Sequence, residues 1–144
     1  MRRSLKLESL GAGYRYAHFM ASWAGNHWGT CRRHTRQQLA VTIITMEEVL
    51  GGWYTQIRQA RDDQQLARAY QALHEAIEFS RSIRILPFDL PEIRRYRQLR
   101  TQHRRIGTND LRIAAIVLEQ RGILVTRNTN DFAYITGLQL DDWA

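Results

Sequence analysis

Three acidic residues in this chain stand at positions where parallel α/β proteins gather catalytic groups. Glu48 lies three residues past an apolar, β-branched run at residues 39–45. Asp110 lies at the predicted start of a helix, and Asp131 lies five residues after Thr126, which ends another apolar run. Such positions converge at the carboxyl edge of a parallel sheet, where clustered carboxylates can bind Mg²⁺ and promote phosphate-ester hydrolysis. The spacing alone predicts an α/β domain with an acidic cleft.

Each acid also has a purely structural interpretation, which its position alone leaves open. Glu48 fits the third position of a capping box that begins at Thr45. Asp110 can simply complement the dipole of its helix, and Asp131 can be an ordinary turn aspartate. Only the joint placement of the three acids favours chemistry.

The elements that must position these acids can be read from residue 39 onward, where strand-like and helix-like segments alternate. This alternation is typical of a parallel α/β sheet. Strands are predicted at residues 39–45, 83–88, 123–126 and 138–140, and residues 4–10 alternate weakly and could form a short strand. Helices are predicted from Thr45 to about Ala60, from an N-cap at Asp62 or Asp63 onward, from Pro91 through Leu99, and from an N-cap at Thr108 or Asn109 to Gly122. The second helix carries an amphipathic stripe, which predicts its buried face: Leu66, Tyr70, Leu73 and Ile77.

Length and composition predict one globular domain. The chain has 144 residues, of which 44% are hydrophobic and 24% are charged, which are ordinary values for a soluble protein. Every apolar run is shorter than the roughly 20 residues of a membrane span, and no signal peptide is visible. Because Cys31 is the only cysteine, we expect no internal disulfide and a cytoplasmic location without membrane contact.

The positive charge is concentrated near the N-terminus. The net charge is +7, and residues 1–38 carry seven basic groups against the single acid Glu8. The basic composition therefore does not predict nucleic-acid binding over the whole fold. A second basic run precedes Asp110 and consists of Arg94, Arg95, Arg97, Arg100, Arg104 and Arg105. It is interpreted first as a solvated helix face. The functional alternative is that it guides an RNA backbone toward the acidic residues.

Several ordered motifs extend over residues 39–144. They are Val41-Thr-Ile-Ile-Thr-Met-Glu-Glu48 with Gly52-Trp53, Leu86-Pro-Phe-Asp89, Ile106-Gly-Thr-Asn-Asp110-Leu-Arg-Ile-Ala-Ala115, Leu124-Val-Thr-Arg-Asn-Thr-Asn-Asp-Phe132 and Gly137-Leu-Gln-Leu-Asp-Asp-Trp143. Through these motifs the chain resembles the PIN-domain ribonucleases, in particular the VapC-type toxins of bacterial toxin–antitoxin pairs.

The resemblance implies a PIN-like three-layer α/β/α fold with a central, mostly parallel sheet. It implies that Glu48, Asp110 and Asp131 are the catalytic, metal-ligating acids, and that Thr126 and Asn128 are polar supports of their site. It also implies endonucleolytic RNA cleavage that depends on Mg²⁺ or Mn²⁺, a homodimer, and neutralisation by a cognate VapB-type antitoxin.

The N-terminal segment 1–38 departs from the family pattern, so we divide the chain into this atypical segment and a PIN-like domain at 39–144. Family members begin with a central strand that ends in a metal-ligating aspartate, whereas this chain has no aspartate before Asp62. The central first strand is therefore expected to be absent or altered. Loss of such a strand would split the sheet, at a cost that a marginal stability of about 5–15 kcal/mol would not absorb.

Three explanations of this departure remain open. In the first, Leu7-Glu8-Ser9 replaces the usual strand end and Glu8 is the first acid. In the second, which we favour, the segment comes from a shifted reading frame or a wrong start. In the third, the segment rebuilds the sheet in another way.

His27, Cys31 and His34, with His18 as a distant fourth group, also resemble a zinc site, but structural zinc sites show tighter paired spacing.

The sequence thus favours a metal-dependent endoribonuclease toxin that hydrolyses RNA phosphodiester bonds at Glu48, Asp110 and Asp131. The alternative from a different class is a catalytically decayed PIN-like protein that binds antitoxin or RNA without cleavage. A zinc-binding structural module at the N-terminus is a third and weaker hypothesis.

Overall fold

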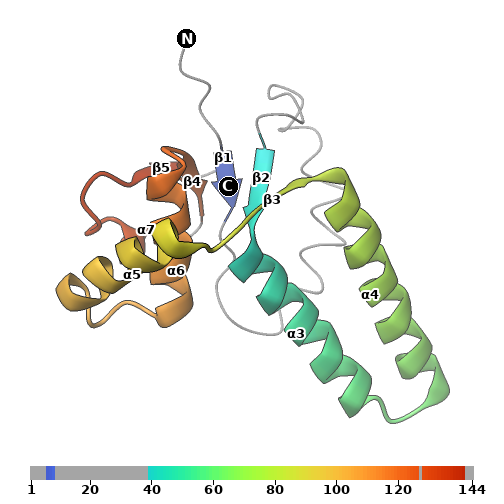
Figure 1. The fold of residues 1–144 in the computed structure, drawn as a ribbon. Helices are drawn as coiled ribbons and strands as arrows, with labels where there is room; N and C mark the ends of the chain where they lie inside the picture. Colours follow the sequence, from blue (N-terminus) through green and yellow to red (C-terminus); the bar gives the residue numbers. More distant parts are fainter. Residues whose placement is uncertain (1–5, 9–38, 127, 142–144) are drawn as a thin grey trace.

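The computed structural model describes residues 6–8, 39–126 and 128–141, and its five strands form one entirely parallel sheet (Figure 1). The strand order is β3-β2-β1-β4-β5. The strands are β1 (Lys6–Glu8), β2 (Leu39–Thr42), β3 (Arg84–Leu86), β4 (Ile123–Val125) and β5 (Gln139–Asp141). The predicted PIN-like α/β fold class is confirmed.

The central strand is present, and it comes from the atypical N-terminal segment. The backbone of β1 pairs with β2 on one side, with Glu8 opposite Val41, and with β4 on the other, with Glu8 opposite Val125. The sheet is therefore continuous. This agrees with the first explanation, in which Leu7-Glu8-Ser9 replaces the usual end of the central strand. The expectation that this strand could be missing is wrong, whereas the origin of the segment in a shifted reading frame stays a hypothesis.

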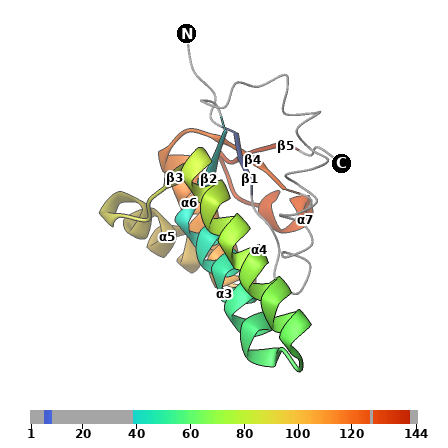
Figure 2. The same cartoon turned by 90° about the vertical axis from the view of Figure 1, so that its right-hand side faces the viewer.

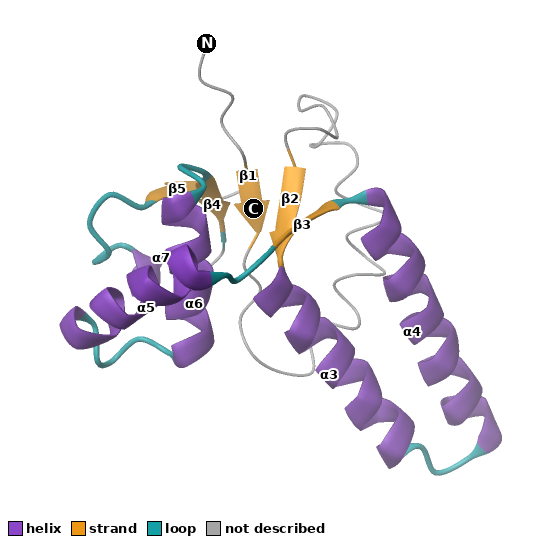
Figure 3. Ribbon diagram, viewed as in Figure 1, coloured by secondary structure: helices purple, strands orange, loops and turns teal. Residues whose placement is uncertain are grey.

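Five helices connect the described strands and are much longer than the strands, except for the last (Figure 3). They are α3 (Ile43–Gln59), α4 (Asp63–Ser82), α5 (Leu90–Gln102), α6 (Thr108–Glu119) and α7 (Thr129–Phe132). Helices α3 and α4 run side by side as a hairpin that projects away from the sheet (Figure 1, Figure 2). Helices α5, α6 and α7 gather on the side of β4 and β5 (Figure 1). None of the helices in the described ranges is long and apolar enough to cross a bilayer.

The boundary between β2 and α3 differs from the prediction. The strand ends at Thr42, which is also the N-cap of α3: its Oγ1 accepts a hydrogen bond from the Thr45 N–H at 3.0 Å. The β-branched residues 43–45 therefore form the first turn of a helix, because capping and burial of Ile44 and Thr45 outweigh their weak strand preference. Glu48 consequently lies in the second turn of α3, and its interpretation as a capping-box glutamate is wrong.

The buried face of α4 also differs from the prediction. Leu66, Tyr70 and Ile77 are exposed, whereas Leu73 is partly buried against the contact with α3, and the fully buried residues are Ala69 and Ala76. Small side chains let α4 pack closely on α3, where Val49 and Trp53 complete the contact. Of the two predicted N-cap candidates, Asp62 is the cap, since its Oδ1 accepts a hydrogen bond from the Gln65 N–H at 2.7 Å.

The main core surrounds α6. Leu111, Ile113, Ala114, Ala115, Ile116 and Val117 have no exposed surface. The sheet residue Leu124 and the α7 residue Phe132 belong to the same core. A helix buried on nearly all sides has a fixed position, so the first turn of α6 is a rigid platform for Asp110.

Candidate functional site

The strand order fixes where a ligand would bind. From β1 the chain builds β2 and β3 on one side of the sheet, and then β4 and β5 on the other. In such open parallel sheets, ligands bind beyond the carboxyl ends of the strands where the order reverses. Here that point lies between β1 and β4, beside the start of α3, since β2 leads directly into that helix.

Asp110 enters this region from the first turn of α6. The helix begins after Gly107, which is its N-cap, so neither Thr108 nor Asn109 caps it as predicted. A Cβ atom at Gly107 would lie 3.0 Å from Asp110 Oδ2, so a larger residue there would displace the carboxylate. Burial, and secondly the negative charge of Asp131, raise the pKa of Asp110 above its ordinary value. The two carboxylates are therefore close enough to repel each other.

Asp131 comes from the short helix α7, which the sequence did not predict. Its Oδ2 accepts a hydrogen bond of 2.6 Å from Asn128 Nδ2. The backbone N–H of Asn128 in turn donates to Thr126 Oγ1 at 3.1 Å. The next residue, Phe132, is 1% exposed and anchors the short helix in the core. The structure thus links Thr126, Asn128 and Asp131 in one chain of hydrogen bonds.

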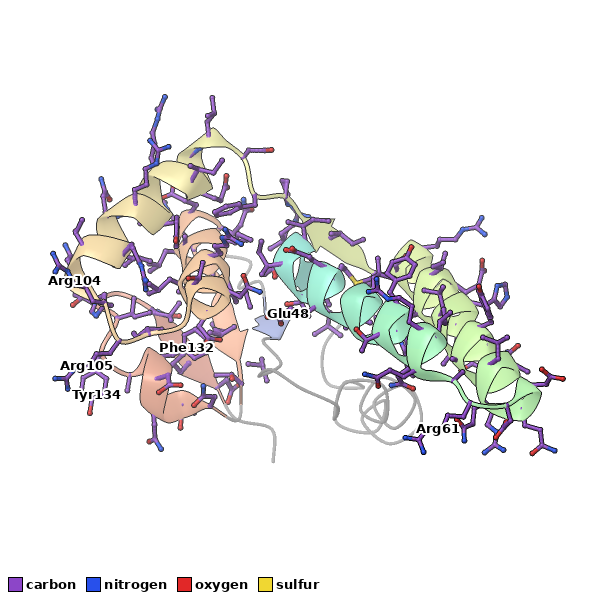
Figure 4. All side chains as sticks on the ribbon, turned by 90° about the horizontal axis from the view of Figure 1, so that it is seen from below. Glu48, Arg61, Arg104, Arg105, Phe132 and Tyr134 are labelled. Carbon is purple, nitrogen blue, oxygen red and sulfur yellow. The ribbon has the colours of Figure 1, made fainter. Side chains whose placement is uncertain are left out.

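Glu48 enters from α3 on the side that faces α6 (Figure 4). Its Oε1 accepts a hydrogen bond of 2.9 Å from Asn109 Nδ2. Since Asn109 precedes Asp110 on α6, this hydrogen bond ties Glu48 to the first turn of the helix that carries Asp110. Even so, no three His, Cys, Asp or Glu side chains within the described ranges lie close enough together to hold a metal ion.

The donor set fits a hard divalent cation. Carboxylate oxygens are the ligands that Mg²⁺ prefers, and it keeps several waters, so it needs few protein ligands. Asp110 and Asp131 form a like-charged pair whose mutual repulsion a cation would relieve. Glu8 ends β1 at the same edge of the sheet, and its backbone lies between those of Val41 and Val125.

All members of the basic run before Asp110 are exposed, and two of them also make structural contacts. Arg95 pairs with Glu119 at 2.7 Å and so joins α5 to α6. Arg100 donates to the carbonyls of Arg104 and Ile106 and holds the loop that leads to Asp110. The other members of the run are also exposed: Arg94, Arg97, Arg104 and Arg105.

The zinc hypothesis concerns His18, His27, Cys31 and His34, which lie outside the described residues.

Asn109 and Arg112 are site residues that sequence reasoning missed. Arg112 Nη1 donates to Asn109 Oδ1 at 3.1 Å, and its guanidinium lies 5.7 Å from the centre of the Tyr96 ring. The available signal was the spacing of three residues between Asn109 and Arg112, which places both on one helix face. Assigning Asn109 as a cap concealed that its side chain was available for Glu48.

Comparison with known proteins gives consistent matches. The family model described as PIN domain matches residues 32–138. Ribonuclease VapC1 of Haemophilus influenzae (strain R2866) is 47% identical over 45 residues, which span 31% of this chain and 34% of that protein. The structure of VapBC2 from Rickettsia felis bound to a promoter DNA fragment matches with a TM-score of 0.73 and 20% identity, covering 97% of this chain and 99% of that one. DNA-bound VapBC from Salmonella typhimurium matches with a TM-score of 0.74 and 16% identity, over 98% and 99% of the two chains.

Proposed function

The chain belongs to the PIN-domain family, and on this premise we propose that it is a metal-dependent endoribonuclease of the VapC type. The observation that carries the proposal is the pair formed by Asp110 and Asp131 at the switch point of the sheet, with the pKa of Asp110 raised by burial and by its neighbour. Two repelling carboxylates in a partly dry site favour a bound cation.

Asp110, Asp131 and Glu48 would hold Mg²⁺ or Mn²⁺ through carboxylate oxygens. The ion would supply an activated water and neutralise charge that develops on the RNA phosphate. Asn128 orients Asp131 through its 2.6 Å hydrogen bond, and Thr126 fixes Asn128 in turn. The chain's own contribution is thus to hold the acids in place before the cation and the RNA arrive.

Glu8 is the proposed replacement for the family's first aspartate. The strand that ends with it occupies the central position of the sheet, where the first metal-ligating acid of the family would lie. A glutamate is one methylene longer than an aspartate and carries the same carboxylate. This proposal adopts the first of the three explanations of the N-terminal segment.

The partners follow from the relatives. VapBC complexes are among the solved structures that this chain resembles, so we propose a VapB-type antitoxin as the cognate partner. The homodimer that the family resemblance implies is proposed as the assembled form. RNA is the proposed substrate because the curated relative is named a ribonuclease. A cytoplasmic location stays a prediction from the single cysteine.

Cleavage of RNA by the purified protein tests the proposal. We expect cleavage with added Mg²⁺ or Mn²⁺ and none with EDTA. Asp110→Asn should reduce the rate at least about 100-fold, since loss of a metal ligand removes several kcal/mol of transition-state stabilisation. Asp63→Asn is the matched control, because Asp63 also lies in the first turn of a helix but on the exposed α4.

The absence of a three-acid cluster among the described residues favours one alternative, a decayed protein that binds antitoxin or RNA without cutting. The same assay separates the two functions. Equal rates for wild type and Asp110→Asn, with RNA or antitoxin still bound, would support the alternative and overturn the ribonuclease proposal.

A further inference from the structure

The first turn of α6 touches both halves of the acidic site. Asp110 lies close enough to Asp131 on α7 for that charge to raise its pKa. The preceding residue, Asn109, bonds instead to Glu48 on α3, at 2.9 Å. Adjacent residues of one rigid helix therefore connect acids that come from separate elements. Among the described contacts, the Asn109 amide is the polar link between Glu48 and the first turn of α6.

Arg112 determines which way the Asn109 amide points. An arginine side chain has only hydrogen-bond donors, so the atom of Asn109 that meets Arg112 Nη1 at 3.1 Å must be the carbonyl oxygen. The NH₂ group then points at Glu48, and an ionised carboxylate can only accept. The two hydrogen bonds therefore run in one direction, from Arg112 to Asn109 and from Asn109 to Glu48.

The guanidinium of Arg112 is itself held in place. It lies over the Tyr96 ring at 5.7 Å, a distance at which a cation is attracted to the ring face. Its Nε is buried and has no hydrogen-bond partner within the described ranges. Leaving a buried donor unpaired costs free energy, so the position of the Arg112 side chain is not the one that maximises stability. Arg112 is half-buried and holds Asn109 at that cost.

We propose that Asn109, oriented by Arg112, is a positioning residue that holds Glu48 in the geometry required for metal binding. The inference rests on the proposed metal-dependent function. Groups that orient a metal ligand from outside the coordination sphere typically change metal affinity about 10- to 100-fold when removed. A hydrogen bond from a rigid core helix supplies such orientation to a side chain on α3, because it limits the rotamers available to Glu48.

Direct Mn²⁺ binding by the full-length, metal-free protein tests the inference, with affinity measured by calorimetric titration and folding checked by circular dichroism. We expect Asn109→Ala to weaken Mn²⁺ binding about 10- to 100-fold. Arg112→Lys keeps the charge but loses the planar group that stacks on Tyr96, and should weaken binding by a smaller factor. Gln71→Ala is the matched control, since Gln71 makes the same kind of amide–carboxylate hydrogen bond, at 2.9 Å, to Glu75 on exposed α4.

A double-mutant comparison separates positioning from a general structural effect. If Asn109 acts through Glu48, then Asn109→Ala should change the affinity of the Glu48→Ala protein less than twofold. An equal loss in both backgrounds, or unchanged affinity in Asn109→Ala alone, would overturn the positioning role while leaving the ribonuclease proposal intact. Failure of the wild-type protein to bind Mn²⁺ would overturn both.

Discussion

Asp110 is the residue whose surroundings most directly connect stability with function. Its pKa is raised first by burial and second by the charge of Asp131. A folded-state pKa above the unfolded value means that the native protein binds this proton more tightly than the unfolded chain does. The contribution of Asp110 to stability is therefore favourable at low pH and is lost as the pH rises through the folded-state pKa. Ionisation of this partly desolvated carboxylate therefore lowers the stability of the metal-free fold.

Replacement of Asp110 by Asn should consequently stabilise the metal-free protein at neutral pH. The gain should shrink as the pH falls toward the ordinary range of a carboxyl group, where the wild-type side chain is protonated in both states. Urea unfolding in EDTA across a pH series measures this difference, with Asp63→Asn as the reference. A mutant that is less stable than wild type at every pH would show that the ionised Asp110 carboxylate is structurally favourable.

Single-residue reasoning succeeded where the signal was local. Asp62 was predicted as a possible N-cap and caps α4. Glu48 was placed near the sheet edge, but the possibility that it was only a capping residue could be removed only after Thr42 proved to be the N-cap. Asn109 was missed because its partner, Glu48, lies 61 positions away in the chain, and no local pattern reports such a contact.

At the level of elements, α7 is the smallest unit that the site requires. It has four residues, carries Asp131 and is held by the buried ring of Phe132. Such a short segment has no helical stability of its own, so its position depends on packing. The sequence did not predict this helix, because four residues cannot show a helical period.

Removing the Phe132 anchor should therefore disturb both the fold and the site. Phe132→Ala is expected to cost about 3–5 kcal/mol of unfolding free energy, and to weaken Mn²⁺ binding in the protein that stays folded. Tyr134→Ala is the control, because Tyr134 is 77% exposed and its loss should stay within about 0.5 kcal/mol. Urea denaturation measures both changes. A loss below about 1 kcal/mol for Phe132→Ala would contradict the anchoring role.

Longer elements were predicted well in type and less well in boundary and orientation. The α4 helix exists, but three of the four residues in its predicted stripe are exposed and Leu73 is only partly buried, because Ala69 and Ala76 allow a closer contact with α3. An amphipathic stripe reports the hydrophobicity of side chains and not how closely they let two helices pack. It therefore predicted burial of Leu66, Tyr70 and Ile77, whereas two alanines are buried.

For the whole molecule, the strand order determines where the candidate site lies. Three residues at positions 6–8 complete the sheet between β2 and β4, although about 30 positions separate them from β2. The parallel alternation from residue 39 predicted an α/β sheet, and the resemblance predicted its family. Neither one established that residues 6–8 fill the central position, because strand pairing over such a distance leaves no periodic signal in the sequence.

The central claim is that Asp110 and Asp131 hold a divalent cation at the switch point of this sheet. A crystal of the full-length protein grown with Mn²⁺, with anomalous scattering recorded for manganese, tests the claim most directly. We expect an anomalous peak in contact with carboxylate oxygens of both aspartates, and no peak there in Asp110→Asn. A fully formed wild-type site without a peak, or a manganese ion bound only elsewhere, would contradict it.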